Sequence, residues 1–271
     1  YDSGKTKKLQ SQTTGIRNLN IKQYKKILLP LPSLSFQSEI VEELDEYQRI
    51  IDSAEQVVEN YKPRIEINNS WKIFKIGELC ELMTGGTPSS TNKEYYNGEI
   101  KWIVSGDIHL GEIYDCPNRI SQKGLENSNA KFLPLDSVLI ALNGQGKTRG
   151  TVAILKTKAT CNQSIVSITP KNRDQLNPKY LYYLLKGMYS KIRNLTGDNQ
   201  RSGLNMKIIR NINISIPSIN IQEKIINQIE KEFGFVKSTE ELIDINDQKI
   251  KNRISRFCKE VRNYTSKSAI Q

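Results

Sequence analysis

The sequence predicts an α+β protein, in which a mixed α/β domain is flanked by two long helices that pair as an antiparallel coiled coil. The first observation behind this prediction is a repeat. The passage LPLPSLSFQSEI (residues 29–40) returns as ISIPSINIQEKI (214–225) at a constant shift of 185 positions. The second is that a heptad-like apolar pattern follows each copy. The third is that residues 71–218, between the copies, alternate strand-like and helix-like patterns.

Each copy of the repeat leads into a segment whose apolar residues recur every three or four positions, which predicts long helices over 33–70 and 219–262. The predicted pairing positions are Ile40, Leu44, Tyr47, Ile51, Val58 and Ile65 in the first helix, and Ile225, Ile229, Val236, Ile243 and Ile250 in the second. Ser35 and Asn220 are the predicted N-caps, and Glu223 completes a capping box with Asn220. Each helix can bury its apolar stripe against the other helix; the alternative is that each stripe packs on the domain between them.

The predicted domain begins with a short strand and a helical turn that run into a Gly-Gly-Thr-Pro loop at 85–88. Residues 100–108 predict a strand leading into a loop. Two further strands, at 137–142 and 150–155, are joined by a glycine-rich connection, and 161–170 continues the sheet. Asn177 and Pro178 predict a helix start, and residues 196–207 predict a polar loop.

The chain is basic, with 40 Lys and Arg against 29 Asp and Glu and a formal net charge of +11. The excess lies mostly between the repeats, because residues 71–218 hold 20 basic and 11 acidic side chains. Such a surface suits a polyanion, since Lys and Arg release counterions from phosphates. Charge alone does not separate a nucleic-acid binder from an ordinary basic protein.

The cysteines and the single histidine argue against a metal site. Cys80, Cys116, Cys161 and Cys258 form no C-x-x-C pair, and His109 is the only histidine of the chain, so we expect no zinc or other metal. The cysteine spacing does not resemble a disulfide framework, which favours incidental thiols in a reducing cytoplasm. Because the sequence has no apolar run of 18 residues and no signal peptide, we expect a cytoplasmic protein.

Two stretches partly match enzyme motifs. ALNGQGKTRG (141–150) ends like a P-loop, but Ala141 stands where the motif needs glycine, and a strand-like segment follows where the motif needs a helix. NPKY (177–180) is similar to the loop with which amino-methyltransferases hold a flipped base, but helix capping explains it and no glycine-rich cofactor loop precedes it. With no paired carboxylates beside a nucleophile motif, the sequence predicts no catalytic residues.

The loops between the predicted strands are rich in side chains that bind DNA. Gln and Arg make bidentate contacts with adenine and guanine edges, whereas Lys and Thr suit phosphates. The candidate DNA-binding residues are Thr87, Ser89, Ser90, Ser105, Asp107, His109, Asn143, Gln145, Lys147, Thr148, Arg149, Asn162, Gln163, Asn199, Gln200 and Arg201. Taken singly, each is better interpreted as a solvated loop residue. The set as a whole predicts a DNA-reading surface.

These motifs, in this order, resemble the specificity subunit of Type I restriction-modification systems. That family alternates two target recognition domains with two conserved helical regions, and each recognition domain ends in an Ile/Leu-Pro-Pro/Ser passage followed by Gln and Ile. Here Leu31-Pro32-Ser33 precedes Gln37 and Ile40, and Ile216-Pro217-Ser218 precedes Gln222 and Ile225. Trp71 with the Gly-Gly-Thr-Pro loop resembles the start of a recognition domain. Residues 136–154 resemble the family's element of strand, glycine-rich loop and strand.

The resemblance implies a non-catalytic subunit that reads one half of a bipartite target in double-stranded DNA. It implies that methyltransferase subunits dock on the helices and that the restriction subunit is reached through them. S-adenosylmethionine, ATP and magnesium would then belong to these partners, and this chain would bind no cofactor. The implied division of the chain is the tail of a first recognition domain (1–32), a central spacer helix (33–70), a recognition domain (71–218), a distal spacer helix (219–262) and a tail (263–271).

The repeat also bears on completeness, because a shift of 185 positions carries Trp71 to well before Tyr1. We therefore expect either a fragment or a subunit with one recognition domain. Such a subunit would form a homodimer or be complemented by a chain that carries the first domain. The alternative function class is a non-catalytic coiled-coil interaction module whose basic domain binds no specific sequence. Competition with random DNA separates the two functions. A specific DNA reader binds its target about 10³-fold or more tightly than random DNA and therefore stays bound, whereas a non-specific basic domain is displaced.

Overall fold

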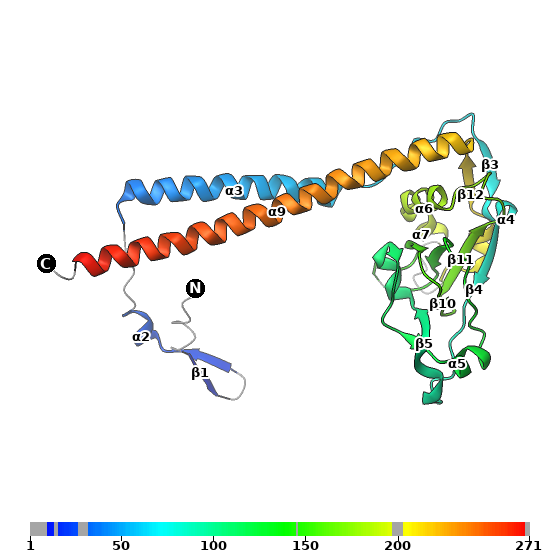
Figure 1. The fold of residues 1–271 in the computed structure, drawn as a ribbon, viewed down its shortest axis with the longest axis horizontal. Helices are drawn as coiled ribbons and strands as arrows, with labels where there is room; N and C mark the ends of the chain where they lie inside the picture. The colour runs from blue at the N-terminus through cyan, green and yellow to red at the C-terminus, as the bar shows by residue number, and fades with distance from the viewer. Residues whose placement is uncertain (1–9, 14–15, 27–31, 145, 197–202, 269–271) are drawn as a thin grey trace. The chain divides into compact units, whose positions relative to one another are not determined.

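The fold is described from a computed structural model, for residues 10–13, 16–26, 32–144, 146–196 and 203–268; within 10–18 and 261–268 only the backbone is described. The chain divides into two compact units, which we call the first unit (residues 1–60 with 236–271) and the second unit (61–235). Helix α9 (Ile219–Ser268) contributes to both (Figure 1). Within the described ranges, no helix is both long and apolar enough to cross a membrane.

A five-stranded sheet forms the centre of the second unit. Its order is β4-β11-β8-β9-β6, and all neighbours are antiparallel except β9 and β6. The strands are β4 (Cys80–Thr84), β6 (Glu112–Ile113), β8 (Val138–Ala141), β9 (Val152–Leu155) and β11 (Ile165–Pro170). This confirms the predicted hairpin of β8 and β9 and the predicted continuation of the sheet by β11.

Both faces of this sheet are buried. Val138 and Ile140 belong to one cluster of buried residues, whereas the alternate residues Leu139 and Ala141 belong to another. Successive side chains of a strand point to opposite faces. A strand that is covered on both sides therefore has an uninterrupted apolar sequence, as β8 and β9 do.

Two smaller sheets, ordered β10-β5-β7 and β12-β3, accompany the central one. Their strands are β3 (Lys72–Lys75), β5 (Tyr96–Ile103), β7 (Arg119–Ile120), β10 (Thr160–Cys161) and β12 (Asn213–Ile216). Short helical segments connect them: α4 (Ile76–Leu79), η1 (Lys93–Tyr95), η2 (Ser105–Leu110) and α5 (Gln122–Glu126). The segment after β5, which was predicted as a loop, is thus a 3₁₀ helix.

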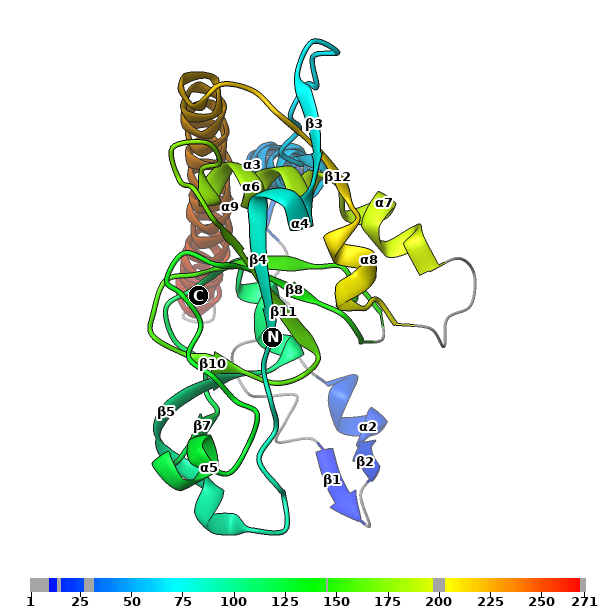
Figure 2. The ribbon, with the colours of Figure 1, turned by 90° about the vertical axis from the view of Figure 1, so that its right-hand side faces the viewer.

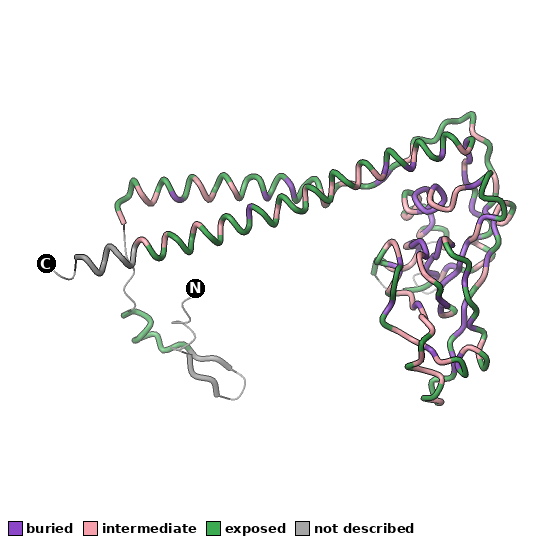
Figure 3. Tube along the Cα trace, viewed as in Figure 1, coloured by how far each residue is buried: buried purple, intermediate pink, exposed green. Residues whose placement is uncertain are grey.

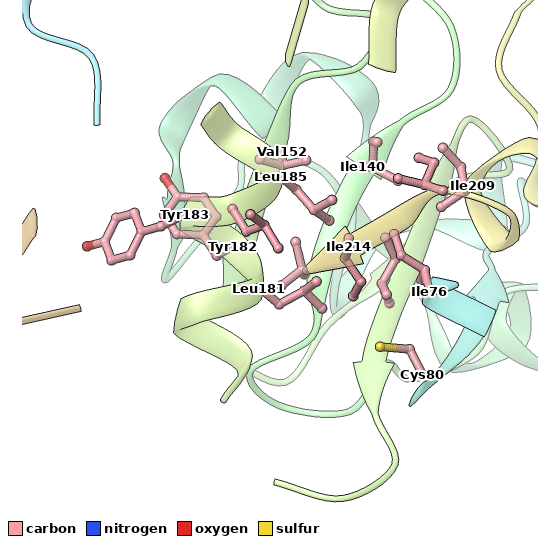
Figure 4. Close-up of a cluster of buried hydrophobic side chains, with 14 of the residues drawn as sticks. Ile76, Cys80, Ile140, Val152, Leu181, Tyr182, Tyr183, Leu185, Ile209 and Ile214 are labelled. Atoms are coloured by element: carbon pink, nitrogen blue, oxygen red, sulfur yellow. The ribbon is translucent and has the colours of Figure 1, made fainter. Parts of the chain in front are cut away.

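Helix α6 (Pro178–Gly187) begins where the sequence predicts, because Asn177 Oδ1 accepts a hydrogen bond from Lys179 N at 2.8 Å and Pro178 occupies the first turn. Leu181 and Leu185 pack in the larger core cluster with Ile140 (Figure 4). The elements that follow are α7 (Tyr189–Arg193), η3 (Asn194–Thr196) and α8 (Met206–Arg210). Helices α7 and α8 lie side by side (Figure 2).

The first long helix, α3 (Leu34–Asn60), ends earlier than the predicted boundary at residue 70. Pro63 explains the difference, since proline lacks an N–H and disfavours a helical conformation of the preceding residue. Ile65, predicted as a pairing position, packs instead against the core of the second unit, and so do Ile225 and Ile229 of α9. For these three residues the prediction of helix pairing was wrong. The second unit, residues 61–235, accordingly extends beyond both boundaries of the predicted domain, 71–218.

The predicted N-caps were also misplaced. Phe36 N donates to Ser33 Oγ at 3.4 Å, so α3 starts after Ser33, and Ser35 lies inside the helix. Helix α9 starts after Ser218, whose carbonyl oxygen accepts from Ile221 N at 2.9 Å. Asn220 and Glu223 therefore lie inside α9 and form no capping box. The serine of the repeated Pro-Ser thus precedes both helices.

In the first unit, α3 and the later part of α9 lie antiparallel. The ring centroids of Phe36 and Phe257 are 6.1 Å apart, and Arg253 Nε donates to Glu43 Oε2 at 2.6 Å. Of the predicted pairing positions, Ile40 and Ile51 are buried, and Leu44, Tyr47, Val58, Val236, Ile243 and Ile250 are half-buried. Figure 3 shows that most other positions of both helices are exposed. The remaining elements of the unit are β1 (Gln10–Thr13) and β2 (Ile16–Leu19), which pair antiparallel, and α2 (Ile21–Tyr24).

Candidate nucleic-acid interface

Four loops of the second unit meet at one end of the central sheet. Val166 lies opposite Thr84, and Ile165 lies opposite Ala141, so the C-terminal ends of β4 and β8 lie beside the start of β11. The loop after β5 reaches the same end, because β6 runs parallel to β9 and the residues before Glu112 therefore lie toward Val152, where β9 starts. We call the loops 85–90, 104–111, 142–151 and 162–164 the loop end of the sheet.

The predicted DNA-binding residues gather at this loop end. The described ones are Thr87, Ser89, Ser90, Ser105, Asp107, His109, Asn143, Lys147, Thr148, Arg149, Asn162 and Gln163, and all of them lie in the four loops. Gln145, Asn199, Gln200 and Arg201 lie outside the described residues. The topology therefore brings together side chains from four separate parts of the sequence.

Side chains link these loops to one another. Thr87 Oγ1 donates to Gln163 Oε1, which joins loop 85–90 to loop 162–164. His109 Nε2 and Thr148 Oγ1 are 3.0 Å apart and share a hydrogen bond, which joins loop 104–111 to loop 142–151. Leu204 N donates to Leu142 O at 2.9 Å, so the segment from residue 203 also lies beside the loop end.

The candidate residues differ in what their side chains already bind. Asp107 Oδ2 accepts from Val104 N at 2.8 Å, and Asn162 Oδ1 accepts from Ser164 N at 3.0 Å, so both stabilise their own loops. Asn143, Lys147 and Gln163 are exposed. Thr87, Ser89, Ser90 and His109 are exposed as well, so a ligand at the loop end would meet side chains from all four loops.

Two glycines at the loop end are required by its geometry. Gly150 has a φ of +84°, in the left-handed region that favours glycine. Gly85 passes so close to the backbone of Cys161 that a Cβ atom at residue 85 would overlap the Cys161 carbonyl. Burial raises the pKa of the Cys161 thiol to about 12, so this cysteine is a neutral packing residue at neutral pH.

No metal-binding cluster accompanies these loops: across the described part of the chain, no group of three or more His, Cys, Asp or Glu side chains could hold a metal ion. The charged side chains of the loop 142–151 are both basic, Lys147 and Arg149. Such a surface is suited to an anionic ligand.

The sequence alone did not identify the side chains that donate hydrogen bonds to the main chain of these loops. Tyr189 Oη donates to Lys147 O at 3.0 Å, and Arg193 Nη1 donates to Arg149 O at 3.2 Å. Trp102 Nε1 likewise donates to Gly86 O at 2.9 Å. Their acceptors are main-chain carbonyls distant in sequence, so no sequence pattern could have revealed these contacts.

Comparison with known proteins supplies a family for this architecture. Residues 68–256 match the family model described as Type I restriction modification DNA specificity domain. The Type I restriction enzyme MjaIX specificity subunit of Methanocaldococcus jannaschii is 30% identical over 165 residues, which are 59% of this chain and 37% of that protein. The EcoR124I/EcoR124II specificity subunit of Escherichia coli is 27% identical over 228 residues, 76% of this chain and 55% of that protein. The chain thus spans between about a third and just over half of these relatives.

Solved structures share the fold. A chain from the work described as "Structural basis underlying complex assembly and conformational transition of the type I R-M system" superposes with a TM-score of 0.58 at 16% identity, covering 82% of this chain and 56% of that chain. The HsdS subunit from Thermoanaerobacter tengcongensis gives a TM-score of 0.51 at 17% identity, covering 90% of this chain and 64% of that chain.

Proposed function

Because this chain belongs to the family of Type I restriction modification DNA specificity domains, we propose that its second unit is a target recognition domain that binds one half of a bipartite DNA site through the loop end of the central sheet. The observation that carries the proposal is the convergence of four loops with exposed Lys, Asn and Gln side chains at one end of the sheet. Amide side chains are suited to base edges, and the basic side chains of loop 142–151 are suited to phosphates. The protein is the reading subunit and performs no catalysis itself.

The two long helices act as spacer and docking scaffold in this proposal. Helices α3 and α9 pair as an antiparallel coiled coil through the half-buried positions of the first unit, supported by the contacts of Phe36 with Phe257 and of Glu43 with Arg253. Methyltransferase subunits dock on this scaffold, and the restriction subunit is recruited through them.

The cofactors of the reaction belong to the partner subunits. S-adenosylmethionine would be bound by the methyltransferase, and ATP and magnesium by the restriction subunit. Burial raises the pKa of the Cys80 and Cys161 thiols to about 12 and also raises the pKa of the Cys116 thiol, so these three thiols are neutral at neutral pH. Cys258 is exposed on α9, away from the second unit's loops in sequence.

Selection from a pool of randomised duplexes tests the proposed function. The chain, in complex with its methyltransferase partner, is expected to enrich one short sequence that it binds about 10³-fold or more tightly than random DNA. We call this sequence the enriched duplex. Enrichment of no sequence, with binding lost to random competitor, would instead establish an interaction module with a non-specific basic domain.

A further inference from the structure

Helix α7 lies directly behind the most basic loop of the loop end. Tyr189 Oη donates to Lys147 O at 3.0 Å, and Arg193 Nη1 donates both to Arg149 O at 3.2 Å and to Tyr189 Oη at 3.3 Å. The two side chains thus form one small network that ends on two carbonyls of the loop 142–151. The packing is close as well, because a Cβ atom at Gly150 would contact Ile192 and Arg193 at 3.6 Å.

The loop needs such support. It contains Gly144, Gly146 and Gly150, all with positive φ, and glycine gives a free chain many accessible conformations. A flexible loop loses this freedom when it binds a ligand, whereas a loop that is already held in its bound conformation does not. Two side chains that fix the carbonyls of Lys147 and Arg149 also fix the directions in which those residues project.

We propose that Tyr189 and Arg193 are positioning residues that hold Lys147, Thr148 and Arg149 in their DNA-binding arrangement without contacting DNA themselves. This inference rests on the proposed function. The hydroxyl of Tyr189 donates to the main chain of the loop, and the guanidinium of Arg193 donates to main chain and hydroxyl, so both side chains act through the loop backbone. The fixed planar geometry of arginine suits it to bridging two acceptors.

The test removes single groups of the network. Tyr189→Phe deletes only the hydroxyl, Arg193→Ala removes the guanidinium, and the double variant combines them. Tyr114→Phe is the matched control: Tyr114 Oη donates to Glu112 Oε2 at 2.7 Å. Tyr114 follows β6 at the end of the sheet opposite the loops, because Ile113 pairs with Leu155 at the end of β9.

Dissociation constants are measured for the enriched duplex and for a random duplex over a series of salt concentrations. Tyr189→Phe is expected to weaken the enriched duplex by about three- to tenfold, the change that corresponds to one lost hydrogen bond. Binding of the random duplex should weaken less than binding of the enriched duplex, because it depends on the phosphate contacts of the loop and not on its base contacts. The double variant should lose less than the product of the two single losses, because both side chains support one loop. Tyr114→Phe should match the wild type on both duplexes.

Amide hydrogen exchange gives a second readout that needs no DNA. In Tyr189→Phe the amides of Gly150 and Thr151 should exchange faster, while those of β8 and β9 stay protected. Unchanged exchange in the loop, together with unchanged affinity for the enriched duplex, would overturn the proposal. A salt slope lowered by about one in Arg193→Ala but unchanged in Tyr189→Phe, with equal weakening of Arg193→Ala on both duplexes, would also overturn it, because Arg193 would then itself be a phosphate contact.

The two proposals fail in distinguishable ways. If the wild-type chain enriches no duplex, the proposed function fails, while the exchange measurement still reports whether Tyr189 and Arg193 hold the loop. If a duplex is enriched and Tyr189→Phe binds it like the wild type, only the positioning role fails.

Discussion

Gln37 and Gln222 occupy the same place in the two copies of the repeat, yet their surroundings differ. Gln222 is fully buried: its Nε2 donates to Pro217 O and Gln175 O, and its Oε1 accepts from Asn177 N, each at 2.9 Å. Among the residues that the structure describes, Gln37 makes one side-chain hydrogen bond, from Nε2 to Pro32 O at 2.7 Å, which corresponds to the bond from Gln222 to Pro217.

The difference shows what the repeated passage does. In the second copy, one glutamine joins the first turn of α9 to the residue that caps α6, so the starts of these two helices share a hydrogen-bonded junction. In the first copy the described bond of the glutamine stays within its own passage, and α3 is buried farther along, at Ile51 and at Ala54, which lies near Leu242 of α9. The same sequence is thus stabilised by a domain in one place and by a helix in the other.

The largest expected effect comes from placing a carboxylate in each of these two environments. Ile229→Asp should destabilise the second unit by roughly 3–5 kcal/mol, because it combines lost apolar burial with an unpaired buried charge. Ile51→Asp should cost a similar amount but separate α3 from α9 and leave the second unit folded. Limited proteolysis and denaturant unfolding would measure both.

Ile50 provides the control for this pair, since it neighbours Ile51 but is 41% exposed. Ile50→Asp should change stability by less than about 0.5 kcal/mol, as expected at a surface position. If Ile51→Asp unfolded the second unit as completely as Ile229→Asp, the two environments would not be separate.

A medium effect is expected at the two glutamines themselves. Gln222→Ala should cost about 2–4 kcal/mol, because it removes three hydrogen bonds of a fully buried side chain, of which the bond to Pro217 O is itself buried. Gln37→Ala removes one partly buried bond and should cost about 0.5–1.5 kcal/mol. Equal losses in thermal or denaturant unfolding would contradict the distinction between the two copies.

The smallest effect concerns the ion pair that links the two helices. The hydrogen bond from Arg253 holds the pKa of Glu43 below its ordinary value of 4.5. Because the pKa is lower in the folded state, the pair stabilises the fold at pH values above about 4.5, and this stability is lost as the pH falls through the folded pKa. For a partly exposed pair we expect about 0.2–1 kcal/mol.

Glu43→Gln should remove the contribution of this ion pair to the pH dependence of the free energy of unfolding. Denaturant unfolding of the helices between pH 3 and pH 6 would measure it. Glu42→Gln is the matched control, since Glu42 is exposed on the same turn. A Glu43→Gln variant with the pH profile of the wild type would show that the pair contributes nothing to the pairing of the helices.

The sequence revealed the elements with strong local signals. Asn177 with Pro178 marked the start of α6, and the apolar runs of β8 and β9 marked their hairpin. Pro63 carries the signal that ends α3, whereas the apolar period continues past it to Ile65 and predicts a longer helix. Ile225 and Ile229 continue the same period, and only tertiary structure decides whether such a stripe meets a helix or a domain.

For the candidate site too, local sequence predicted some features, whereas others depend on the tertiary structure. Loop composition predicted which residues gather at the loop end, because loops between strands of one sheet meet at its ends. The contacts that organise them depend on the register of the sheet and on side chains distant in sequence. His109 beside Thr148 and Tyr189 beside the carbonyl of Lys147 are examples.

The salt dependence of DNA binding at matched lysines tests most directly whether the loop end meets DNA. Lys147 is exposed in loop 142–151, whereas Lys72 is exposed in β3, which precedes β4 and so lies away from the loop end. With the enriched duplex as probe, Lys147→Ala should weaken binding and reduce the slope of log K against log salt by about one, as the loss of one phosphate contact requires. Lys72→Ala should leave the slope as in the wild type. Equal slopes for wild type, Lys147→Ala and Lys72→Ala would contradict the assignment of DNA binding to the loop end.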